Sequence, residues 1–284
     1  MSSTLKNEKL LLNSIIKTRC MLGEGLYVDN ETKSWIDIKK NNFFLLKGES
    51  LEKYNLKNKP SVILSREKET FLIGTKTGLV KFDTNLKEER IIKNFSTFHS
   101  LKNYRSNDGL SFDNYILLSF MHKSKPDIVP GIIYLIKNNK VTVLDNEIYI
   151  PNSFIKISKR KILITDSLKG IIWLFELDKD GSKINKKIWK DFNSKMTPDG
   201  GCLFNNRVFL SFWDFAAVGM FSLDGNLIKY LKVPSLRPTN CKVDPIKKEV
   251  WITSALEGLT KKEVETYPES GNTFSFSLKA FGIC

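Results

Sequence analysis

Residues 161–178 read KILITDSLKGIIWLFELD, in which two short apolar runs flank a polar turn. The runs are rich in Ile, Leu, Phe and Trp. Short apolar runs of β-branched and aromatic residues, bounded by turn-forming residues, are typical of β-strands. The segment therefore predicts a unit of at least two strands.

The same pattern recurs along the chain, which identifies a repeat. The other copies lie at 33–46, 70–83, 115–136, 207–225 and 249–278. The copies are 37, 45, 46, 46 and 42 residues apart when these positions are taken as equivalent: Trp35, Leu72, Leu117, Leu163, Phe209 and Trp251. Units of about 40–50 residues with four short strands each are those of a β-propeller. The sequence therefore predicts an all-β fold, a six-bladed β-propeller.

The final repeat has too few apolar runs for a complete blade. Residues 8–20, EKLLLNSIIKTRC, carry suitable apolar residues, and we expect this N-terminal segment to complete the last blade, which removes an exposed sheet edge. No linker rich in Pro, Gly or Ser interrupts the repeats, so we expect residues 1–284 to form a single propeller domain.

The composition is that of a globular protein with a basic surface. The 284 residues are 41% hydrophobic and 27% charged, which excludes a mostly disordered or collagen-like chain. The 45 Lys and Arg against 31 Asp and Glu give a net charge of +14, but only 7 of these cations are Arg and the Lys residues are scattered. Because nucleic-acid sites usually concentrate cations on one face, often beside exposed aromatic residues, we expect no nucleic-acid partner.

Signals for membranes and secretion are missing from the sequence. No run approaches the roughly 18 apolar residues of a membrane-spanning helix, and Asn13 interrupts the leucines at 10–12 with no small-residue cleavage site behind them. We expect a cytoplasmic protein without a membrane partner, present as a monomer or weak homo-oligomer.

The cysteines show no paired spacing, so we expect reduced thiols at Cys20, Cys202, Cys241 and Cys284.

Side chains that carry oxygen occupy the same phase in several repeats. Each lies 10 or 11 residues before the equivalent position of its repeat; they are Glu24, Asn107, Asn152 and Asp199, with Asn240 as a further candidate. Because the innermost strands of a propeller line its channel, these side chains should meet at one end of it. Taken singly, the segments around them are ordinary turn signals. Together, two carboxylates and two amides would be costly to bury without a cation or a substrate.

The donor set predicts a central-channel metal site for one divalent cation. Oxygen ligands suit Ca²⁺, which we expect first, and also Mg²⁺ or Mn²⁺; Zn²⁺ is less suited because no His or Cys shares the phase. Such a cation can polarise a bound ester or can only rigidify the channel, and the residues by themselves leave both roles open.

Longer motifs resemble the regucalcin (senescence marker protein) and gluconolactonase family of six-bladed propellers. They are LGEGLYVDNETKSWIDI at 22–38, RSNDG at 105–109, IPNSF at 150–154, ILITDSLKGIIWLFELD at 162–178, TPDGGCLFNNRVFLSFW at 197–213, VPSLRPTNCKVDP at 233–245 and VWITSALEGLT at 250–260. The resemblance implies that Glu24, Asn152 and Asp199 bind one divalent cation and that Asp199 is also the general base. It further implies that Arg105 and Asn107 contact the substrate.

The chain departs from the family pattern at 119–123, where SFMHK replaces a Gly-Thr-Met segment that a glutamate follows. If Lys123 occupies the place of that glutamate, it donates a hydrogen bond where the family accepts one, which favours a carboxylate or carbonyl on the substrate. A solvated loop lysine is the alternative. The aromatic residues Phe212, Trp213 and Phe215 either wall the pocket or pack between blades.

The function expected from these observations is that of a metal-dependent lactonase acting on a small, polar, sugar-type lactone. The metal would polarise the carbonyl and Asp199 would activate water. Two alternatives stay open: hydrolysis of phosphotriesters or other esters at the same site, and a non-catalytic calcium-binding propeller.

Overall fold

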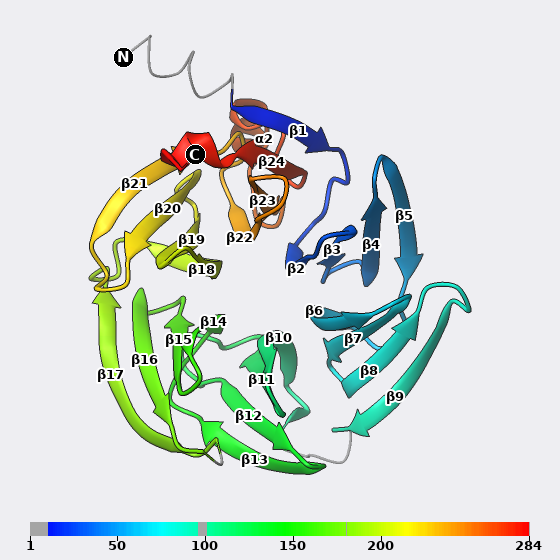
Figure 1. The fold of residues 1–284 in the computed structure, drawn as a ribbon, viewed down its shortest axis with the longest axis vertical. Coiled ribbons are helices and arrows are strands. Elements are labelled where there is room, and N and C mark those ends of the chain that lie inside the picture. The colour runs from blue at the N-terminus through cyan, green and yellow to red at the C-terminus, as the bar shows by residue number, and fades with distance from the viewer. Residues whose placement is uncertain (1–10, 96–100, 180, 284) are drawn as a thin grey trace.

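The computed structural model describes residues 11–95, 101–179 and 181–283, and in these ranges the chain forms six four-stranded sheets. Figure 1 shows the sheets arranged as blades around a centre, with one strand of each sheet innermost. The innermost strands of neighbouring blades contact one another all the way round the ring. The prediction of an all-β, six-bladed propeller is confirmed.

The first three blades follow one another along the chain, and their strands are given from the channel outward. Blade 1 contains β2 (Gly23–Val28), β3 (Thr32–Asp37), β4 (Asn42–Lys47) and β5 (Ser50–Asn55). Blade 2 contains β6 (Pro60–Glu67), β7 (Thr70–Thr75), β8 (Gly78–Asp83) and β9 (Glu88–Asn94). Blade 3 contains β10 (Tyr104–Phe112), β11 (Tyr115–His122), β12 (Ile132–Lys137) and β13 (Lys140–Asp145).

The last three blades follow the same order, except that the sixth takes its outer strand from the N-terminus. Blade 4 contains β14 (Pro151–Ser158), β15 (Lys161–Asp166), β16 (Ile171–Leu177) and β17 (Lys183–Asp191). Blade 5 contains β18 (Thr197–Phe204), β19 (Arg207–Trp213), β20 (Ala217–Ser222) and β21 (Leu227–Lys232). Blade 6 contains β22 (Pro238–Asp244), β23 (Glu249–Ser254), β24 (Thr273–Ser277) and β1 (Leu12–Ile16).

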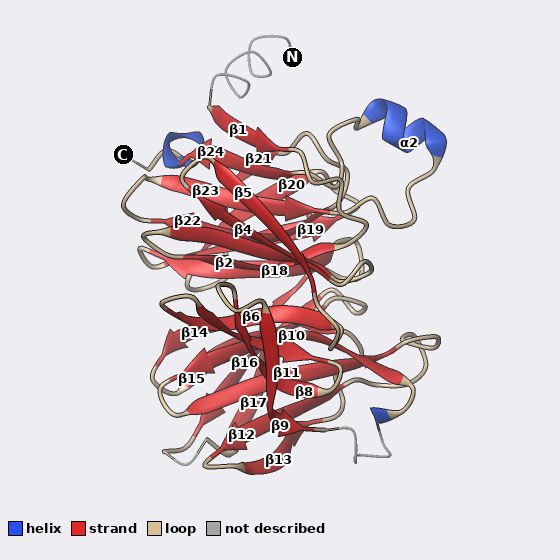
Figure 2. Ribbon diagram, turned by 90° about the vertical axis from the view of Figure 1, so that its right-hand side faces the viewer, coloured by secondary structure: helices blue, strands red, loops and turns tan. Residues whose placement is uncertain are grey.

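Two short helices accompany blade 6. The helix α2 (Lys261–Thr266) lies in the loop between β23 and β24, and Figure 2 shows that it stands out from the body of strands. A reciprocal pair of hydrogen bonds between Thr260 and Glu263 caps its N-terminus. The 3-10 helix η2 (Leu278–Phe281) follows β24 and buries Leu278, Ala280 and Phe281.

Burial changes across each blade, and this change explains the repeat in the sequence. Every residue of β3 is buried, and the equivalent residues Trp35, Leu117, Leu163 and Phe209 have no exposed surface. The outermost strand β17, by contrast, is mostly exposed. A strand that neighbouring blades cover on both faces gains from apolar residues on both faces. Most second strands therefore carry an apolar run, such as ILI at 162–164 in β15, whereas β3 keeps only Trp35 and Ile36 between polar residues that are buried as well.

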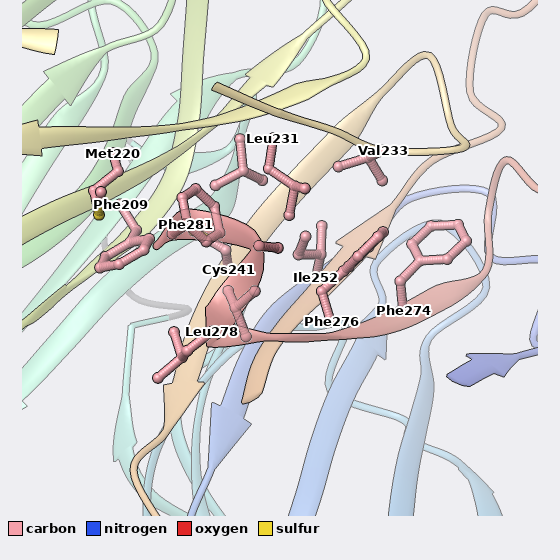
Figure 3. Close-up of a cluster of buried hydrophobic side chains, with 13 residues drawn as sticks. Phe209, Met220, Leu231, Val233, Cys241, Ile252, Phe274, Phe276, Leu278 and Phe281 are labelled. Carbon is pink, nitrogen blue, oxygen red and sulfur yellow. The ribbon is translucent and has the colours of Figure 1, made fainter. Parts of the chain in front are cut away.

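The apolar core lies between adjacent blades rather than in the centre of the ring. Figure 3 shows the interface of blades 5 and 6, where Phe209 lies beside Phe281 and the cluster extends to Ile252 and Phe276. The rings of Phe209 and Phe281 meet edge to face with centroids 5.0 Å apart. The helix η2 thus contributes its buried side chains to this interface.

The ring closes at blade 6. There β1 pairs with β24 antiparallel, so segments from the two ends of the described chain share one sheet. Across the junction of blades 6 and 1, Lys33 Nζ lies 2.6 Å from Asp244 Oδ2, and both side chains are almost fully buried. At the same junction the Thr239 hydroxyl donates a hydrogen bond to the Gly23 carbonyl.

Some sequence expectations concern residues outside the described ranges. Residues 8–10 of the expected closing segment and Cys284 are among them, whereas Cys20, Cys202 and Cys241 are free thiols. In the described part of the chain, no helix has the length and apolarity needed to cross a bilayer.

We predict that Asp244→Asn lowers the free energy of unfolding by about 3–5 kcal/mol, because it leaves the Lys33 ammonium buried without its partner. Urea unfolding measures the change. The control is Asp113→Asn, which breaks an exposed ion pair with Lys156 and should cost about 0–1 kcal/mol. Equal costs for the two variants would show that the buried pair does not hold the junction.

The same pair should make stability depend on pH. Burial by itself would raise the pKa of Asp244, but the hydrogen bonds from Lys33 and from the N–H groups of Lys247 and Ile246 outweigh it and lower the pKa. The stabilising contribution is therefore present above the unfolded pKa of about 4 and is lost as the pH falls through the folded pKa. Unfolding of Asp244→Asn should depend less steeply on pH below 4 than unfolding of the wild type.

Candidate functional site

A β-bulge interrupts the pairing of each of the six innermost strands in the described structure. At each bulge the innermost strand carries one more residue than the strand it pairs with, and β6 and β14 each have two bulges. A bulge re-aims the side chains beside it. In β2, β10, β14 and β18 the residue predicted for the site lies in the bulge or directly before it, namely Glu24, Asn107, Asn152 and Asp199.

These four side chains are more than nine-tenths buried and lie at one cavity of about 280 Å³. The residues that line the cavity are Leu22, Glu24, Arg105, Asn107, Met121, Ile150, Asn152, Ser167, Thr197, Asp199, Trp213, Arg237, Glu257 and Gly258. Its volume is near the lower limit for small-molecule sites. The cavity therefore suits a ligand of the size of a small ring compound.

Hydrogen bonds between blades hold the predicted cation ligands. Asn152 Nδ2 donates to Asp199 Oδ1, which joins blade 4 to blade 5. Asn240 Nδ2 donates to Glu24 Oε2 at 3.3 Å, which joins blade 6 to blade 1. Gly200 lies between these pairs, and a Cβ at this position would lie 2.4 Å from the Asn240 amide. Only glycine permits this approach of blade 5 to blade 6.

The two carboxylates share an unfavourable electrostatic environment. Burial, and then the negative charge of Asp108, raise the pKa of Glu24 to about 7. Burial, followed by the charges of Glu24 and Asp108, raises the pKa of Asp199 well above its ordinary value. None of the ion pairs among the described residues involves Glu24 or Asp199. Among these residues no cationic side chain therefore pairs directly with either carboxylate; burial and the charge of Asp108 outweigh the charge of Arg105, which lowers the pKa of Glu24.

The donor chemistry fits a hard divalent cation. Two carboxylates offer the charge, and the amide oxygen of Asn240 is buried without a hydrogen-bond partner. Asn152 donates its amide nitrogen to Asp199, while its amide oxygen accepts the Ser153 N–H at 3.0 Å and keeps a second lone pair for a cation. Within the described ranges no three His, Cys, Asp or Glu side chains form a metal-binding group, so any site here depends on amide oxygens as well. Oxygen sets of this kind suit Ca²⁺, Mg²⁺ and Mn²⁺.

The predicted substrate residues Arg105 and Asn107 lie beside this cluster. The Arg105 terminal nitrogen Nη1 donates to Asn107 Oδ1 at 2.6 Å, and Asn107 Nδ2 donates to the Pro151 carbonyl at 2.9 Å. Burial lowers the pKa of Arg105, while the charges of Glu257, Glu24 and Asp199 raise it. Asn107 therefore uses both ends of its amide to fix Arg105 against blade 4.

Not every predicted residue is brought to the cavity. Lys123 has an exposed side chain and is not among the lining residues, and its backbone N–H donates to the Asn103 carbonyl at 2.9 Å. The three aromatic residues at 212–215 differ in their surroundings. Trp213 lines the cavity, Phe212 is buried in the core, and Phe215 is 46% exposed.

Two charged residues that line the cavity, Arg237 and Glu257, do not share the offset of the predicted site residues within their repeats. The Arg237 guanidinium lies 4.8 Å from the centre of the Trp213 ring, and it donates to Asp214 at 2.5 Å and to the Glu257 carbonyl. The Glu257 carboxylate pairs with Lys39 at 2.5 Å. Both Arg237 and Glu257 lie in quoted motifs, but they lie outside the strands, where the offset rule does not apply.

Comparison with solved structures gives the same fold. The regucalcin of Agrobacterium tumefaciens, a calcium-binding protein, matches with a TM-score of 0.86 at 23% identity over 93% of each chain. A luciferin-regenerating enzyme matches with 0.82 at 18% identity over 93% of this chain and 95% of its own. A gluconolactonase from Xanthomonas campestris matches with 0.71 at 12% identity over 91% of this chain and 86% of its own.

The family comparison extends over most of the chain. The model of the SMP-30/Gluconolactonase/LRE-like region matches residues 22–256. This range begins just before Glu24 on β2 and ends after β23, so it includes all six innermost strands and the four clustered oxygen donors. The chain belongs to the SMP-30/gluconolactonase/LRE-like family.

Proposed function

We propose that the protein is a divalent-cation-dependent hydrolase that opens a small, polar, sugar-type lactone. The observation that carries the proposal is the convergence of two buried carboxylates, Glu24 and Asp199, with the guanidinium of Arg105 at one small cavity. A site that only bound a cation would need the carboxylates, but it would not need an arginine beside them.

Three residues would hold the cation: Glu24, Asn152 and Asp199. When bound, the cation polarises the ester carbonyl and stabilises the negative charge that develops on its oxygen. Asp199 accepts the proton of the attacking water at Oδ2, the carboxylate oxygen that Asn152 does not engage. Asn152, by holding Oδ1, orients the carboxylate for this transfer.

Arg105 orients the substrate. Its described hydrogen bonds, to Asn107 and to the Ser106 carbonyl, use a single terminal nitrogen. The remaining N–H groups are therefore available for charge-assisted hydrogen bonds to lactone oxygens. The apolar side chains of Leu22, Met121 and Ile150 line the same cavity and limit the access of bulk water.

Family membership supports this proposal. Relatives of the same fold include a gluconolactonase and a calcium-binding regucalcin, which makes lactones the first substrates to test and Ca²⁺ the first cation. Mg²⁺ and Mn²⁺ follow because carboxylate and amide oxygens suit them as well, and Zn²⁺ comes last because no His or Cys is among the described residues that line the cavity.

The decisive experiment uses protein treated with EDTA, a panel of sugar and alkyl lactones, and each cation added back. We predict that Asp199→Ala lowers turnover by about 10²–10⁴-fold or more, because the variant lacks both the proton acceptor and a ligand. Calorimetry should show weakened cation binding in the same variant. The matched control Asp127→Ala removes an exposed carboxylate outside the cavity and should keep wild-type values.

Arg105→Ala should separate substrate binding from cation binding. We predict a loss of about 10–100-fold in kcat/KM, as expected when charge-assisted hydrogen bonds are removed, with cation affinity nearly unchanged. The exposed Arg160→Ala is the control and should behave as the wild type. Equal loss of cation binding in Arg105→Ala and Asp199→Ala would contradict the separate roles.

The alternatives give different results in the same assay. Turnover of phosphotriesters or open-chain esters without turnover of any lactone would move the function to another ester at the same site. Stabilisation of the fold by a cation, with no turnover of any ester, would indicate a binding protein.

A further inference from the structure

One hydroxyl at the cavity has no hydrogen-bond partner. Ser167 is 4% exposed, its Oγ is buried and unpaired, and the residue lines the cavity that holds Glu24 and Asp199. Among the described residues with an unpaired buried side-chain atom, Ser167 alone belongs to the lining of this cavity. Buried hydroxyls in folded proteins are nearly always paired, so an unpaired one at a ligand cavity indicates a partner supplied by the ligand.

The buried carboxylate of the preceding residue, Asp166, fixes the turn that carries Ser167. Asp166 is 3% exposed and caps the turn between β15 and β16. Its Oδ1 accepts hydrogen bonds from the backbone N–H groups of Leu168 at 3.2 Å and Lys169 at 3.3 Å. Its Oδ2 accepts a hydrogen bond from the backbone N–H of Tyr149 at 3.0 Å. The Ser167 hydroxyl is therefore held on a rigid turn, as a binding residue requires.

The strand pairing in blade 4 shows how far Ser167 lies from Asn152 along the channel. Asn152 pairs with Thr165, Pro151 pairs with Asp166, and the Ser167 N–H donates to the Ile150 carbonyl at 3.1 Å. Ser167 thus lies two strand positions beyond Asn152, on the order of 7 Å along the strand. A lactone whose ester group lies at Asp199 and Asn152 would turn the far side of its ring toward Ser167.

We infer that Ser167 is a substrate-binding residue that selects hydroxylated lactones. Its Oγ forms a hydrogen bond with a hydroxyl on the ring or side arm of the lactone, opposite the ester group. A serine hydroxyl can donate and accept, so it matches another hydroxyl whichever partner donates. An alkyl lactone of the same ring size leaves Oγ unpaired. The inference rests on the proposed lactonase function.

The test compares two lactones with the same six-membered ring: glucono-δ-lactone, which carries hydroxyls, and δ-valerolactone, which carries none. For Ser167→Ala we expect kcat/KM for glucono-δ-lactone to fall by about 3–10-fold, mainly through KM, because one neutral hydrogen bond is lost. The value for δ-valerolactone should stay unchanged. The control is Ser34→Ala, which removes another unpaired buried hydroxyl in blade 1, away from the cavity, and should leave the ratio of the two substrates as in the wild type.

The outcomes separate this inference from the proposed function. If the wild type hydrolyses lactones and Ser167→Ala keeps the wild-type ratio, Ser167 does not select the substrate although the enzyme is a lactonase. An equal loss on both lactones would likewise overturn the inference, because it would indicate a structural effect. If the wild type hydrolyses neither lactone with any cation, the proposed function itself is wrong and the inference falls with it.

Discussion

The closure of six sheets around one channel is the constraint on which the rest of the structure depends. The oxygen donors of the site come from four different innermost strands, β2, β10, β14 and β18, so the site exists only while the blades hold fixed positions. The pairing of β1 with β24 completes blade 6, and blade 6 in turn separates the two carboxylates of the site. Asn240 of blade 6 binds Glu24 of blade 1 and packs against Gly200, the neighbour of Asp199 in blade 5. The seam that closes the ring therefore also sets the spacing of the candidate catalytic groups.

The electrostatics of the site oppose the stability of the fold. Glu24 and Asp199 are buried beside Asp108, and their raised pKa values express the cost of keeping them charged when no cationic side chain in the described ranges forms an ion pair with either. The same protein shows elsewhere how a buried carboxylate is stabilised, because Lys33 pairs with Asp244 at the junction of blades 6 and 1. The site lacks such a partner, which is the arrangement expected where a bound cation supplies the positive charge.

The sequence predicted those site residues that lie on the innermost strands at the same offset in each repeat. It did not predict the site residues that lie outside the strands. Glu24, Asn152 and Asp199 could be found by their offset because each lies on an innermost strand at the same height. Arg237 and Ser167 lie in turns, and no periodicity marks a turn residue that faces the cavity. Lys123 shows the converse, since its place in a motif suggested a substrate contact but its side chain is exposed. Motif position fixes the order of residues along the chain, but the direction of a side chain at the end of a strand depends on the local turn.

The sequence by itself determined the number of blades, the strand type and the oxygen-bearing residues of four innermost strands, Glu24, Asn107, Asn152 and Asp199. It did so because burial on both faces of the second strands favours apolar residues at the centre of each of them, and these residues set the phase for all other positions. Only the tertiary structure decided which of those residues touch, that Asn107 fixes Arg105 and that Ser167 is buried without a partner. These facts depend on the angles between blades and on the bulges in the innermost strands, which arise from packing between segments far apart in the chain.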